Sequence, residues 1–210
     1  MVFNNFINRT ITSFILLFIF SFLIIFYDSY IKHLTYLIYL IIFIEILIFF
    51  RSNFLIFILS LIYLFLSLFS LNFYFNSYYI KEEFLFVILL VIIFDITSYI
   101  FGSKFGKLKI LPAISPNKTY FGFFSGVLCT IFLGYLINYF FKFITIEFMF
   151  YYILVILISA FLGDIIESFL KRKSNLKNSS KLLPGHGGFF DRFDSIIMVF
   201  ISLFLFKSFY

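Results

Sequence analysis

The chain is poor in the residues on which soluble and secreted domains depend. Only 12% of its 210 residues are charged, and Cys129 is its one cysteine. A single cysteine can form neither an internal disulfide nor a cysteine metal cluster, so both are excluded. Apolar residues make up 63% of the chain, and no soluble core of this size could bury so much Phe and Ile. The composition therefore predicts a protein whose solvent is the lipid bilayer.

Apolar runs long enough to cross a membrane recur along the chain. A transmembrane helix needs about 20 apolar residues, and six segments come close to that length before a shorter seventh. The segments are 11–27, 34–50, 54–73, 84–101, 119–141, 148–170 and a last one from Phe189 or Ser195 to Phe206. We expect an all-α, polytopic integral membrane protein with about seven transmembrane helices. The first run is too long for a signal peptide and no small-residue cleavage site follows it, so we expect it to be retained.

Basic residues are distributed unevenly between the two sides that these spans define. With the N-terminus in the cytoplasm, twelve Lys and Arg residues fall on the cytoplasmic side and four on the other. The cytoplasmic set is Arg9, Arg51, Lys104, Lys107, Lys109, Lys118 and the six basic residues from Lys171 to Arg192; the outer set is Lys32, Lys81, Lys142 and Lys207. The bias predicts a cytoplasmic active surface. The alternative that these lysines only fix topology and contact anionic headgroups stays open.

A polar face is expected near the end of the sixth segment. Asp164, Glu167, Ser168, Lys171 and Arg172 are spaced i, i+3, i+4, i+7 and i+8, which is one face of an α-helix. A carboxylate at the centre of a span costs about 2.5–3.5 kcal/mol and usually marks a cavity or a functional site. A purely structural pair between Asp164 and Lys171 stays open as the alternative.

The start of the last helix is expected to supply two more carboxylates. If it begins near Phe189, Asp191 and Asp194 share one face of its first turns. A helix N-terminus favours carboxylates and phosphates, and a Gly-rich turn before it lets the backbone approach a phosphate closely. The glycines of that turn are Gly185, Gly187 and Gly188. Carboxylates from two helices beside a basic loop predict a metal–phosphate site with the oxygen ligands that Mg²⁺ prefers.

A second polar stretch joins the fourth and fifth segments. Asp95, Ser98, Tyr99 and Gly102 follow helical spacing and lead into a basic connection. Lysines there can neutralise phosphate, prolines stiffen the chain, and hydroxyls donate hydrogen bonds or cap the next helix. These residues are Lys107, Lys118, Pro112, Pro116, Ser115 and Thr119. We expect the connection to contact substrate, although a topology-setting loop with ordinary caps would look partly alike.

At these residues the chain resembles the phosphatidate cytidylyltransferases, also called CDP-diacylglycerol synthases. The C-terminal motif of that family reads S-x-x-K-R-x4-K-D-x-S-x2-L-P-x-H-G-G-x-x-D-R-x-D. It is matched by Ser168, Lys171, Arg172, Lys177, Ser180, Leu183, Pro184, His186, Gly187, Gly188, Asp191, Arg192 and Asp194. The resemblance covers roughly residues 95–205 and includes the upstream S-P-x-K-T run from Ser115 to Thr119.

Two positions depart from the family pattern. Asn178 stands where the motif has Asp, and Phe121 stands where relatives usually carry Glu. Both changes remove a negative charge, so the chain would be a degenerate copy if either position were essential. Because Asp164, Asp191 and Asp194 are all retained, we favour an active enzyme.

The resemblance implies a nucleotidyltransferase of phospholipid biosynthesis. Its substrates would be CTP and phosphatidic acid, and its products CDP-diacylglycerol and pyrophosphate. It implies a catalytic transmembrane region at 95–210 with two basic cytoplasmic loops, after an N-terminal hydrophobic transmembrane region at 1–94. The protein would lie in a bacterial inner membrane among membrane lipids, with its active site facing the cytoplasm and with no nucleic acid partner. A homodimer is left open.

The resemblance also implies roles for individual residues. The catalytic set would be Asp164, Ser168, Lys171, Arg172, Asp191 and Asp194. Its three aspartates would hold one or two Mg²⁺ ions, with a monovalent ion as an open alternative. Substrate binding would fall to Ser115, Lys118, Thr119, Lys177, Lys181, His186, Gly187, Gly188 and Arg192.

Three other functions are compatible with parts of this pattern. A CTP-dependent lipid kinase would share the metal and the basic loops but would release CDP. A catalytically degenerate, lipid-binding homologue is permitted by Asn178 and Phe121. A transporter is the weakest alternative, because Glu45 is the one carboxylate near mid-membrane in the second segment, and a lone carboxylate is more often hydrogen-bonded or protonated than part of a relay.

Overall fold

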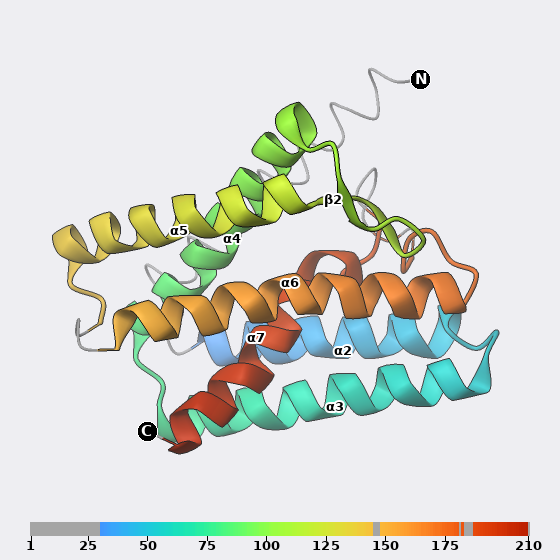
Figure 1. Ribbon diagram of the computed structural model, residues 1–210. Coiled ribbons are helices and arrows are strands. Elements are labelled where there is room, and N and C mark those ends of the chain that lie inside the picture. Colours follow the sequence, from blue (N-terminus) through green and yellow to red (C-terminus); the bar gives the residue numbers. More distant parts are fainter. Residues whose placement is uncertain (1–29, 145–147, 181, 183–186, 210) are drawn as a thin grey trace. The chain divides into compact units, whose positions relative to one another are not determined.

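The computed structural model describes residues 30–144, 148–180, 182 and 187–209, most of which are helical (Figure 1). The expected first span, 11–27, and the predicted site residues Lys181 and His186 lie outside the described residues. The elements are α2 (Ile31–Phe49), α3 (Phe54–Ser77), α4 (Lys81–Phe105), β1 (Lys109–Leu111), β2 (Ser115–Thr119), α5 (Tyr120–Phe141), α6 (Met149–Lys173) and α7 (Phe190–Phe209).

Five helices of the described chain, α2 to α6, are long and apolar enough to cross a membrane. An all-α, polytopic membrane protein is therefore confirmed. The expected number of seven spans is not confirmed, because the segment 11–27 is outside the described residues and α7 is not among the five. Helix α7 has 20 residues, but its first turns carry Asp191, Arg192 and Asp194, which lower its hydropathy. It begins one residue after Phe189, which was the earlier of the two start positions expected from the sequence.

Packing divides the chain into two compact units. The first unit is Met1–Leu68 with Leu170–Phe193, and the second is Phe69–Phe169 with Asp194–Tyr210. Helices α3, α6 and α7 each run from one unit into the other. The units change at three points in the chain, after Leu68, Phe169 and Phe193. The division at residue 94, which separates a hydrophobic region from the proposed catalytic region, stays a prediction.

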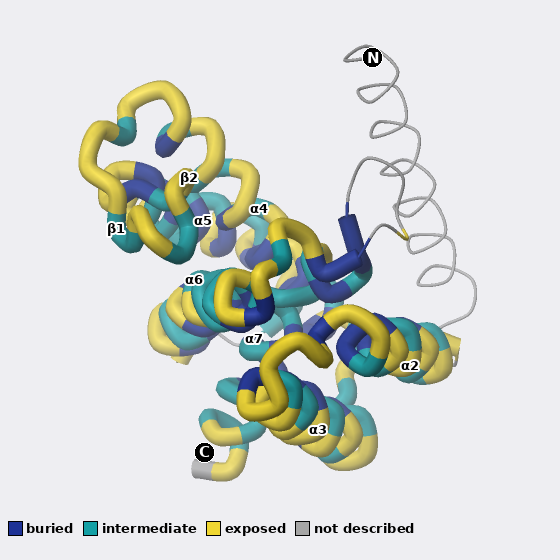
Figure 2. Tube along the Cα trace, turned by 90° about the vertical axis from the view of Figure 1, so that its right-hand side faces the viewer, coloured by how far each residue is buried: buried dark blue, intermediate teal, exposed yellow. Residues whose placement is uncertain are grey.

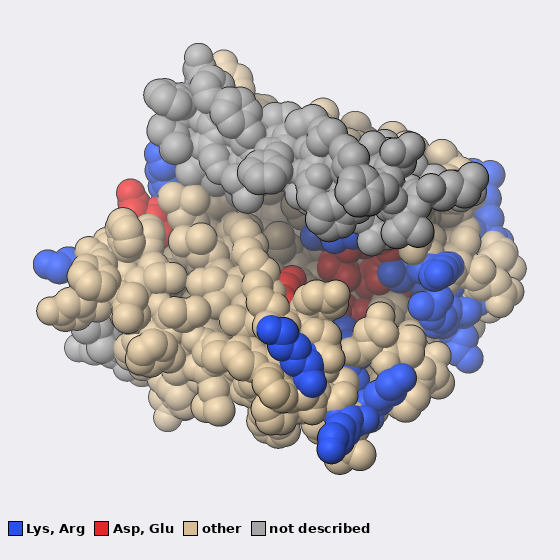
Figure 3. Space-filling model, turned by 90° about the horizontal axis from the view of Figure 1, so that it is seen from above, with Lys and Arg blue, Asp and Glu red and all other residues tan. Residues whose placement is uncertain are grey.

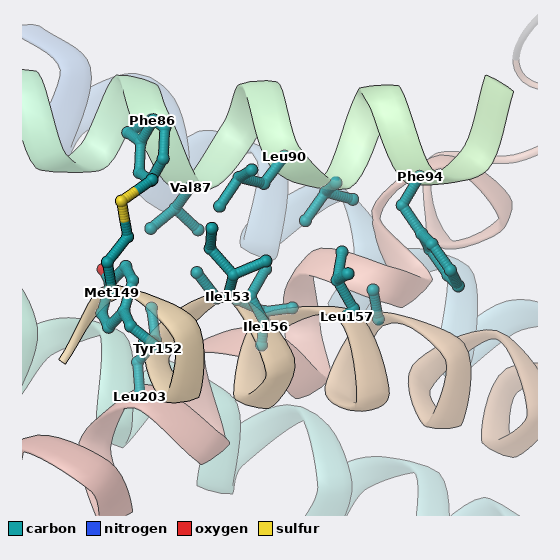
Figure 4. Close-up of a cluster of buried hydrophobic side chains, with 13 residues drawn as sticks. Phe86, Val87, Leu90, Phe94, Met149, Tyr152, Ile153, Ile156, Leu157 and Leu203 are labelled. Carbon is teal, nitrogen blue, oxygen red and sulfur yellow. The ribbon is translucent and has the colours of Figure 1, made fainter. Parts of the chain in front are cut away.

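The core of the second unit is built by α4, α6 and α7. Figure 4 shows Leu90 and Phe94 of α4 pointing toward Ile153 and Leu157 of α6, with Leu203 of α7 on the far side of α6. These five side chains are at most 3% exposed. Because lipid tails are as apolar as these side chains, close van der Waals packing rather than escape from water holds such helices together in a membrane.

Small residues let α5 approach α4 closely. The buried residues of α5 recur at every fourth position, which places them on one face, and three of them are Gly122, Gly126 and Gly134. A Cβ atom on Gly122 would stand 2.7 Å from the Ser98 carbonyl oxygen and 2.9 Å from the Gly102 Cα atom. Only glycine tolerates this backbone-to-backbone approach, which resembles small-xxx-small helix packing in membranes.

The basic connection before α5 forms a two-stranded hairpin that the sequence analysis did not anticipate. Strands β1 and β2 are antiparallel, with Lys109 opposite Thr119 and Leu111 opposite Ser115. The hairpin ends at the expected helix cap, because the Thr119 hydroxyl oxygen accepts a 3.1 Å hydrogen bond from the Gly122 amide. The pairing of β1 with β2 therefore fixes the position of the last residues of this connection at the start of α5.

Helix α2 of the first unit has one buried side and one exposed side (Figure 2). Ile38, Ile42 and Ile46 are at most 6% exposed, whereas Leu40 and Ile48 are more than half exposed. Exposed large apolar side chains at this density fit a lipid environment. The face of the molecule in Figure 3 is in keeping with this, because most of its described surface belongs to residues that are neither acidic nor basic.

Candidate functional site

Asp164 of α6 is the centre of a polar cluster in the second unit. Its Oδ2 atom forms an ion pair with Lys118 of β2, and its Oδ1 atom accepts a 2.8 Å hydrogen bond from the Ser195 hydroxyl. The Lys118 ammonium also lies 4.9 Å from the centre of the Phe161 ring. The Lys118 and Asp164 side chains are 22% and 23% exposed. The pair is thus partly shielded from solvent but still accessible to a ligand.

Asp194 of α7 belongs to the same cluster. Its carboxyl group is hydrogen-bonded to that of Asp164, and Glu167 and Asp95 are close enough to act on it electrostatically. The approach depends on Gly163, where a Cβ atom would stand 2.4 Å from the Asp194 carbonyl oxygen. Carboxylates this close repel one another unless they share a proton or a cation. Asp164 and Asp194 thus lie together in the second unit, whereas Asp191, which the sequence also predicts beside Asp164, belongs to the first unit.

A cleft of about 240 Å³ opens at this cluster. Both members of the Lys118–Asp164 pair line it, together with Asp95 of α4. Ser115 and Thr119, both predicted as substrate-binding residues, also line it. Aromatic rings from α4, α5 and α6 form its apolar walls. The cleft thus combines one cation, two carboxylates and hydroxyl groups with a largely apolar enclosure.

Asp191, in the first turn of α7, is the centre of another polar cluster, in the first unit. Its Oδ1 atom accepts a 2.6 Å hydrogen bond from the Lys171 ammonium at the end of α6. Its Oδ2 atom accepts from the Ser179 amide at 2.9 Å, the Ser179 hydroxyl at 3.0 Å and the Gly188 amide at 2.8 Å. The Lys171 and Asp191 side chains are only 12% and 9% exposed. Lys171 thus pairs with Asp191.

Glu45 of α2 is hydrogen-bonded to the same part of the chain, although it is far from it in the sequence. The residue is 0% exposed. Its Oε1 atom accepts hydrogen bonds from the Ser180 hydroxyl at 2.7 Å and the Phe189 amide at 2.8 Å. Its Oε2 atom accepts from the Phe190 amide at 3.0 Å and the Ser179 hydroxyl at 3.3 Å. The expectation that this carboxylate is hydrogen-bonded is confirmed.

The glycines before α7 are needed for space. A Cβ atom on Gly188 would stand 2.1 Å from the Ser179 hydroxyl oxygen and 2.6 Å from Glu45 Oε1. Gly187 has a φ of +88°, in the left-handed region that favours glycine. The amides of Gly188, Phe189 and Phe190 therefore meet carboxylates of the protein itself, where the sequence analysis expected the Gly-rich turn to meet phosphate.

The remaining predicted residues are distributed between the two units. Arg172, Lys177 and Arg192 of the first unit are exposed, so a phosphate can reach them without further desolvation of the protein. Arg172 also donates a 3.1 Å hydrogen bond to the Leu176 carbonyl, which closes the turn after α6. Ser168 of α6 is half-buried and belongs to the second unit.

The chain that the structure describes contains no group of three or more His, Cys, Asp and Glu side chains arranged to hold a metal ion. Its carboxylate oxygens are nevertheless the donor type that Mg²⁺ selects, and this ion commonly uses one or two carboxylates together with substrate phosphates. Asp164 and Asp194, in hydrogen-bonding contact, meet that smaller requirement.

Sequence reasoning missed three contributors to these clusters, namely Glu45, Ser179 and Ser195. Glu45 is the one acidic residue of α2, but its partners are 134 to 145 residues further along the chain. Ser179 falls at an unspecified position of the family motif, and Ser195 follows its last aspartate. A polar residue in an apolar helix was the available signal for Glu45, and nothing in the pattern identified what it contacts.

Comparison with known proteins agrees with the resemblance. Residues 49–210 match the sequence model of the cytidylyltransferase family. Proteins named phosphatidate cytidylyltransferase from Staphylococcus epidermidis and Staphylococcus saprophyticus are 44% identical to this chain over 119 and 117 residues. The one from Staphylococcus aureus is 40% identical over 116 residues. Each match covers 55% of this chain and 45% of the relative, so the chain spans about half the length of the curated relatives it matches.

Proposed function

Because this chain belongs to the cytidylyltransferase family, we propose that it transfers the cytidylyl group of CTP to phosphatidic acid, giving CDP-diacylglycerol and pyrophosphate. The staphylococcal relatives carry the name of that activity. The observation that carries the proposal is that two carboxylates of the region that resembles the family each pair with a lysine of its motifs. Asp164 pairs with Lys118, and Asp191 pairs with Lys171.

The proposed reaction needs alignment and charge neutralisation more than it needs a nucleophile from the protein. An oxygen of the phosphatidate phosphate attacks the α-phosphorus of CTP. The bond from that phosphorus to the oxygen bridging it to the β-phosphorus breaks, and pyrophosphate leaves with the electron pair. The attacking phosphate is already anionic near neutral pH, so no serine or cysteine has to be activated.

The basic residues would hold two anionic substrates together. Lys118 lines the cleft beside Asp164 and is suited to meet a phosphate there. Lys171, Arg172, Lys177 and Lys181 would screen the repulsion between the lipid phosphate and the triphosphate. Ser115, Thr119 and Ser168 would donate hydrogen bonds that orient phosphates, and His186 would do the same. Arg192, which is exposed in the first turn of α7, belongs to the C-terminal family motif and would also bind substrate.

We assign Mg²⁺ to the aspartates of α6 and α7, namely Asp164, Asp191 and Asp194. Asp164 and Asp194 would supply oxygen donors in the second unit, and Asp191 would supply one in the first unit. A bound divalent ion would neutralise charge on the CTP phosphates and on the departing pyrophosphate. Such an ion would also relieve the repulsion between the Asp164 and Asp194 carboxylates.

The orientation follows from charge. Both basic connections, 102–118 and 171–188, would face the cytoplasm, where CTP is found, and the segment 11–27 and α7 would complete seven spans. Phosphatidic acid would enter from the inner leaflet of a bacterial cell membrane. The positive-inside bias of twelve against four basic residues supports this arrangement.

Purified protein in phosphatidate-containing micelles tests the reaction. With CTP labelled at the α-phosphate, we expect label in the lipid and one pyrophosphate released per lipid formed, both dependent on Mg²⁺. A parallel reaction with diacylglycerol and CTP labelled at the γ-phosphate should leave the lipid unlabelled.

The alternatives give different products. Label from the γ-phosphate in the lipid, with release of CDP, would identify a lipid kinase and overturn the proposal. No label from either nucleotide, in protein that is folded and binds phosphatidate vesicles, would identify a degenerate homologue. Asn178→Asp and Phe121→Glu, which restore the family residues, should then be tested for recovered transfer.

A further inference from the structure

Glu45 lies outside the residues that carry the family match. The matched region begins at residue 49, and Glu45 precedes it in the last turns of α2. The side chain is fully buried, yet it carries two oxygen atoms that must be satisfied. Four donors satisfy them: two hydroxyls, from Ser179 and Ser180, and two amides, from Phe189 and Phe190. Together these donors flank the loop whose glycines precede α7.

The contacts of Glu45 lead directly to Asp191. The Ser179 hydroxyl is 3.3 Å from Glu45 Oε2 and 3.0 Å from Asp191 Oδ2, and its single proton can be donated to only one of them at a time. Three consecutive backbone amides also donate to these two carboxylates. Gly188 donates to Asp191, whereas Phe189 and Phe190 donate to Glu45. A displacement of Glu45 would therefore disturb three of the four groups that define the Asp191 Oδ1 and Oδ2 positions.

We infer that Glu45 is a positioning residue, which anchors the two ends of the segment from Ser179 to Phe190, at 179–180 and at 189–190, and so holds Asp191 in the orientation required for cytidylyl transfer. The inference rests on the proposed function only in that Asp191 takes part in the reaction. Glu45 itself touches no substrate. Its negative charge suits the task, because it faces the N-terminal amides of α7, where the helix dipole favours an anion.

A purely space-filling role does not account for these contacts. An apolar side chain would fill the same volume in α2 without the desolvation cost of a carboxylate. It would remove the acceptor of the Phe189 and Phe190 amides and of the Ser180 hydroxyl, and would leave the Ser179 hydroxyl with Asp191 alone. Each such loss at a buried donor to a charged group changes an equilibrium by roughly ten- to a hundredfold.

Two variants separate anchoring from bulk stability. Glu45→Gln keeps the size but replaces one acceptor oxygen with an amino group, which cannot accept from the Phe190 amide. Ser180→Ala removes one donor and leaves the carboxylate intact. Glu83→Gln is the matched control, because Glu83 is another buried carboxylate, 6% exposed, that accepts hydrogen bonds from Tyr152 and Lys207 in the second unit.

The first readout does not depend on activity. Lys173 and Lys177 are exposed and precede the anchored segment, so limited trypsin digestion of the full chain in detergent reports on how firmly that segment is held. We expect cleavage after Lys177 to be at least about tenfold faster in Glu45→Gln than in the natural protein. Ser180→Ala should show a smaller increase, and Glu83→Gln should cleave at the natural rate.

The second readout is kinetic. Glu45→Gln should lower kcat for CDP-diacylglycerol formation by about ten- to a hundredfold. It should also raise the Mg²⁺ concentration for half-maximal rate, with KM for phosphatidate unchanged. Cleavage at the natural rate in Glu45→Gln overturns the inference, and so does a normal kcat combined with faster cleavage. If the natural protein shows no transfer from CTP, the proposed function fails, while the trypsin comparison still decides whether Glu45 anchors the segment.

Discussion

Asp164 and Asp191 have the same kind of surroundings although they lie in different units. Each carboxylate is paired with one lysine, Lys118 or Lys171, and each accepts from a serine hydroxyl. An ion pair lets both charges be held in partly buried positions at a lower desolvation cost than either would have alone. In the proposed reaction, a phosphate that pairs with either lysine would free its carboxylate for a cation. Such exchange is how a site can accept an anionic nucleotide and its cation together.

Asp191→Asn is expected to reduce cytidylyl transfer by at least about a hundredfold. The amide keeps one acceptor oxygen but loses the charge that pairs with Lys171, and it is a poor ligand for Mg²⁺. The measurement is the Mg²⁺-dependent rate of CDP-diacylglycerol formation, with size-exclusion chromatography in detergent as the check on folding. Near-normal turnover in well-folded Asp191→Asn protein would refute the assignment of Asp191 to the metal.

Lys118→Ala is expected to lower kcat/KM for CTP by about 10²–10³-fold. The substitution removes the one cation among the described residues that line the cleft, and leaves Asp164 beside the Ser195 hydroxyl and the Asp194 carboxyl group. Lys109→Ala is the matched control, because Lys109 is exposed on β1 of the same hairpin. Equal losses in the two variants would show that the hairpin contributes only general positive charge.

At the scale of elements, the spans were largely predictable and the contacts between them were not. Apolar length placed the second to sixth segments within a few residues of α2 to α6, because a run that must satisfy its backbone inside lipid becomes a helix. The hairpin was missed, since its strands lack the alternation of apolar and polar residues that marks a half-buried strand. The partners of Glu45 and Asp164 were not predictable either, because side-chain pairing over such separations depends on how helices pack.

The α4–α5 contact makes a prediction about stability. Gly122→Ala places a Cβ atom within 2.7–2.9 Å of two backbone atoms of α4, so the helices must separate. We expect a loss of about 1–3 kcal/mol in the free energy of unfolding, as for other overpacked sites. Thermal unfolding in detergent measures it. Leu128→Ala is the control from the same helix, because Leu128 is 69% exposed and should change the midpoint little.

At the scale of the whole molecule, charge placement is the feature that ties the fold to a cellular compartment. The chain carries a formal net charge of +6, yet only 12% of its residues are charged. Most of the basic residues fall in the two connections that flank α5 and α6, and the proposed topology puts both connections on one side because an even number of spans separates them. Two lysines of these connections, Lys118 and Lys171, pair with carboxylates of the proposed site. Topology and substrate recognition are predicted to share residues, which explains why neither role could be separated from the other in the sequence.

Cysteine labelling can test this orientation directly. In a Cys129→Ser background, Lys107→Cys reports on the hairpin connection and Lys81→Cys reports on the start of α4, at the opposite end of that helix. A membrane-impermeant maleimide should label Lys107→Cys only in inside-out vesicles and Lys81→Cys only in intact spheroplasts. Helix α4 has 25 residues, about 37 Å at 1.5 Å per residue, which is long enough to keep the two positions on opposite sides of the bilayer. Labelling of both positions from one side would contradict the span assignment, and the reverse pattern would put the basic connections, and with them the proposed CTP site, outside the cytoplasm.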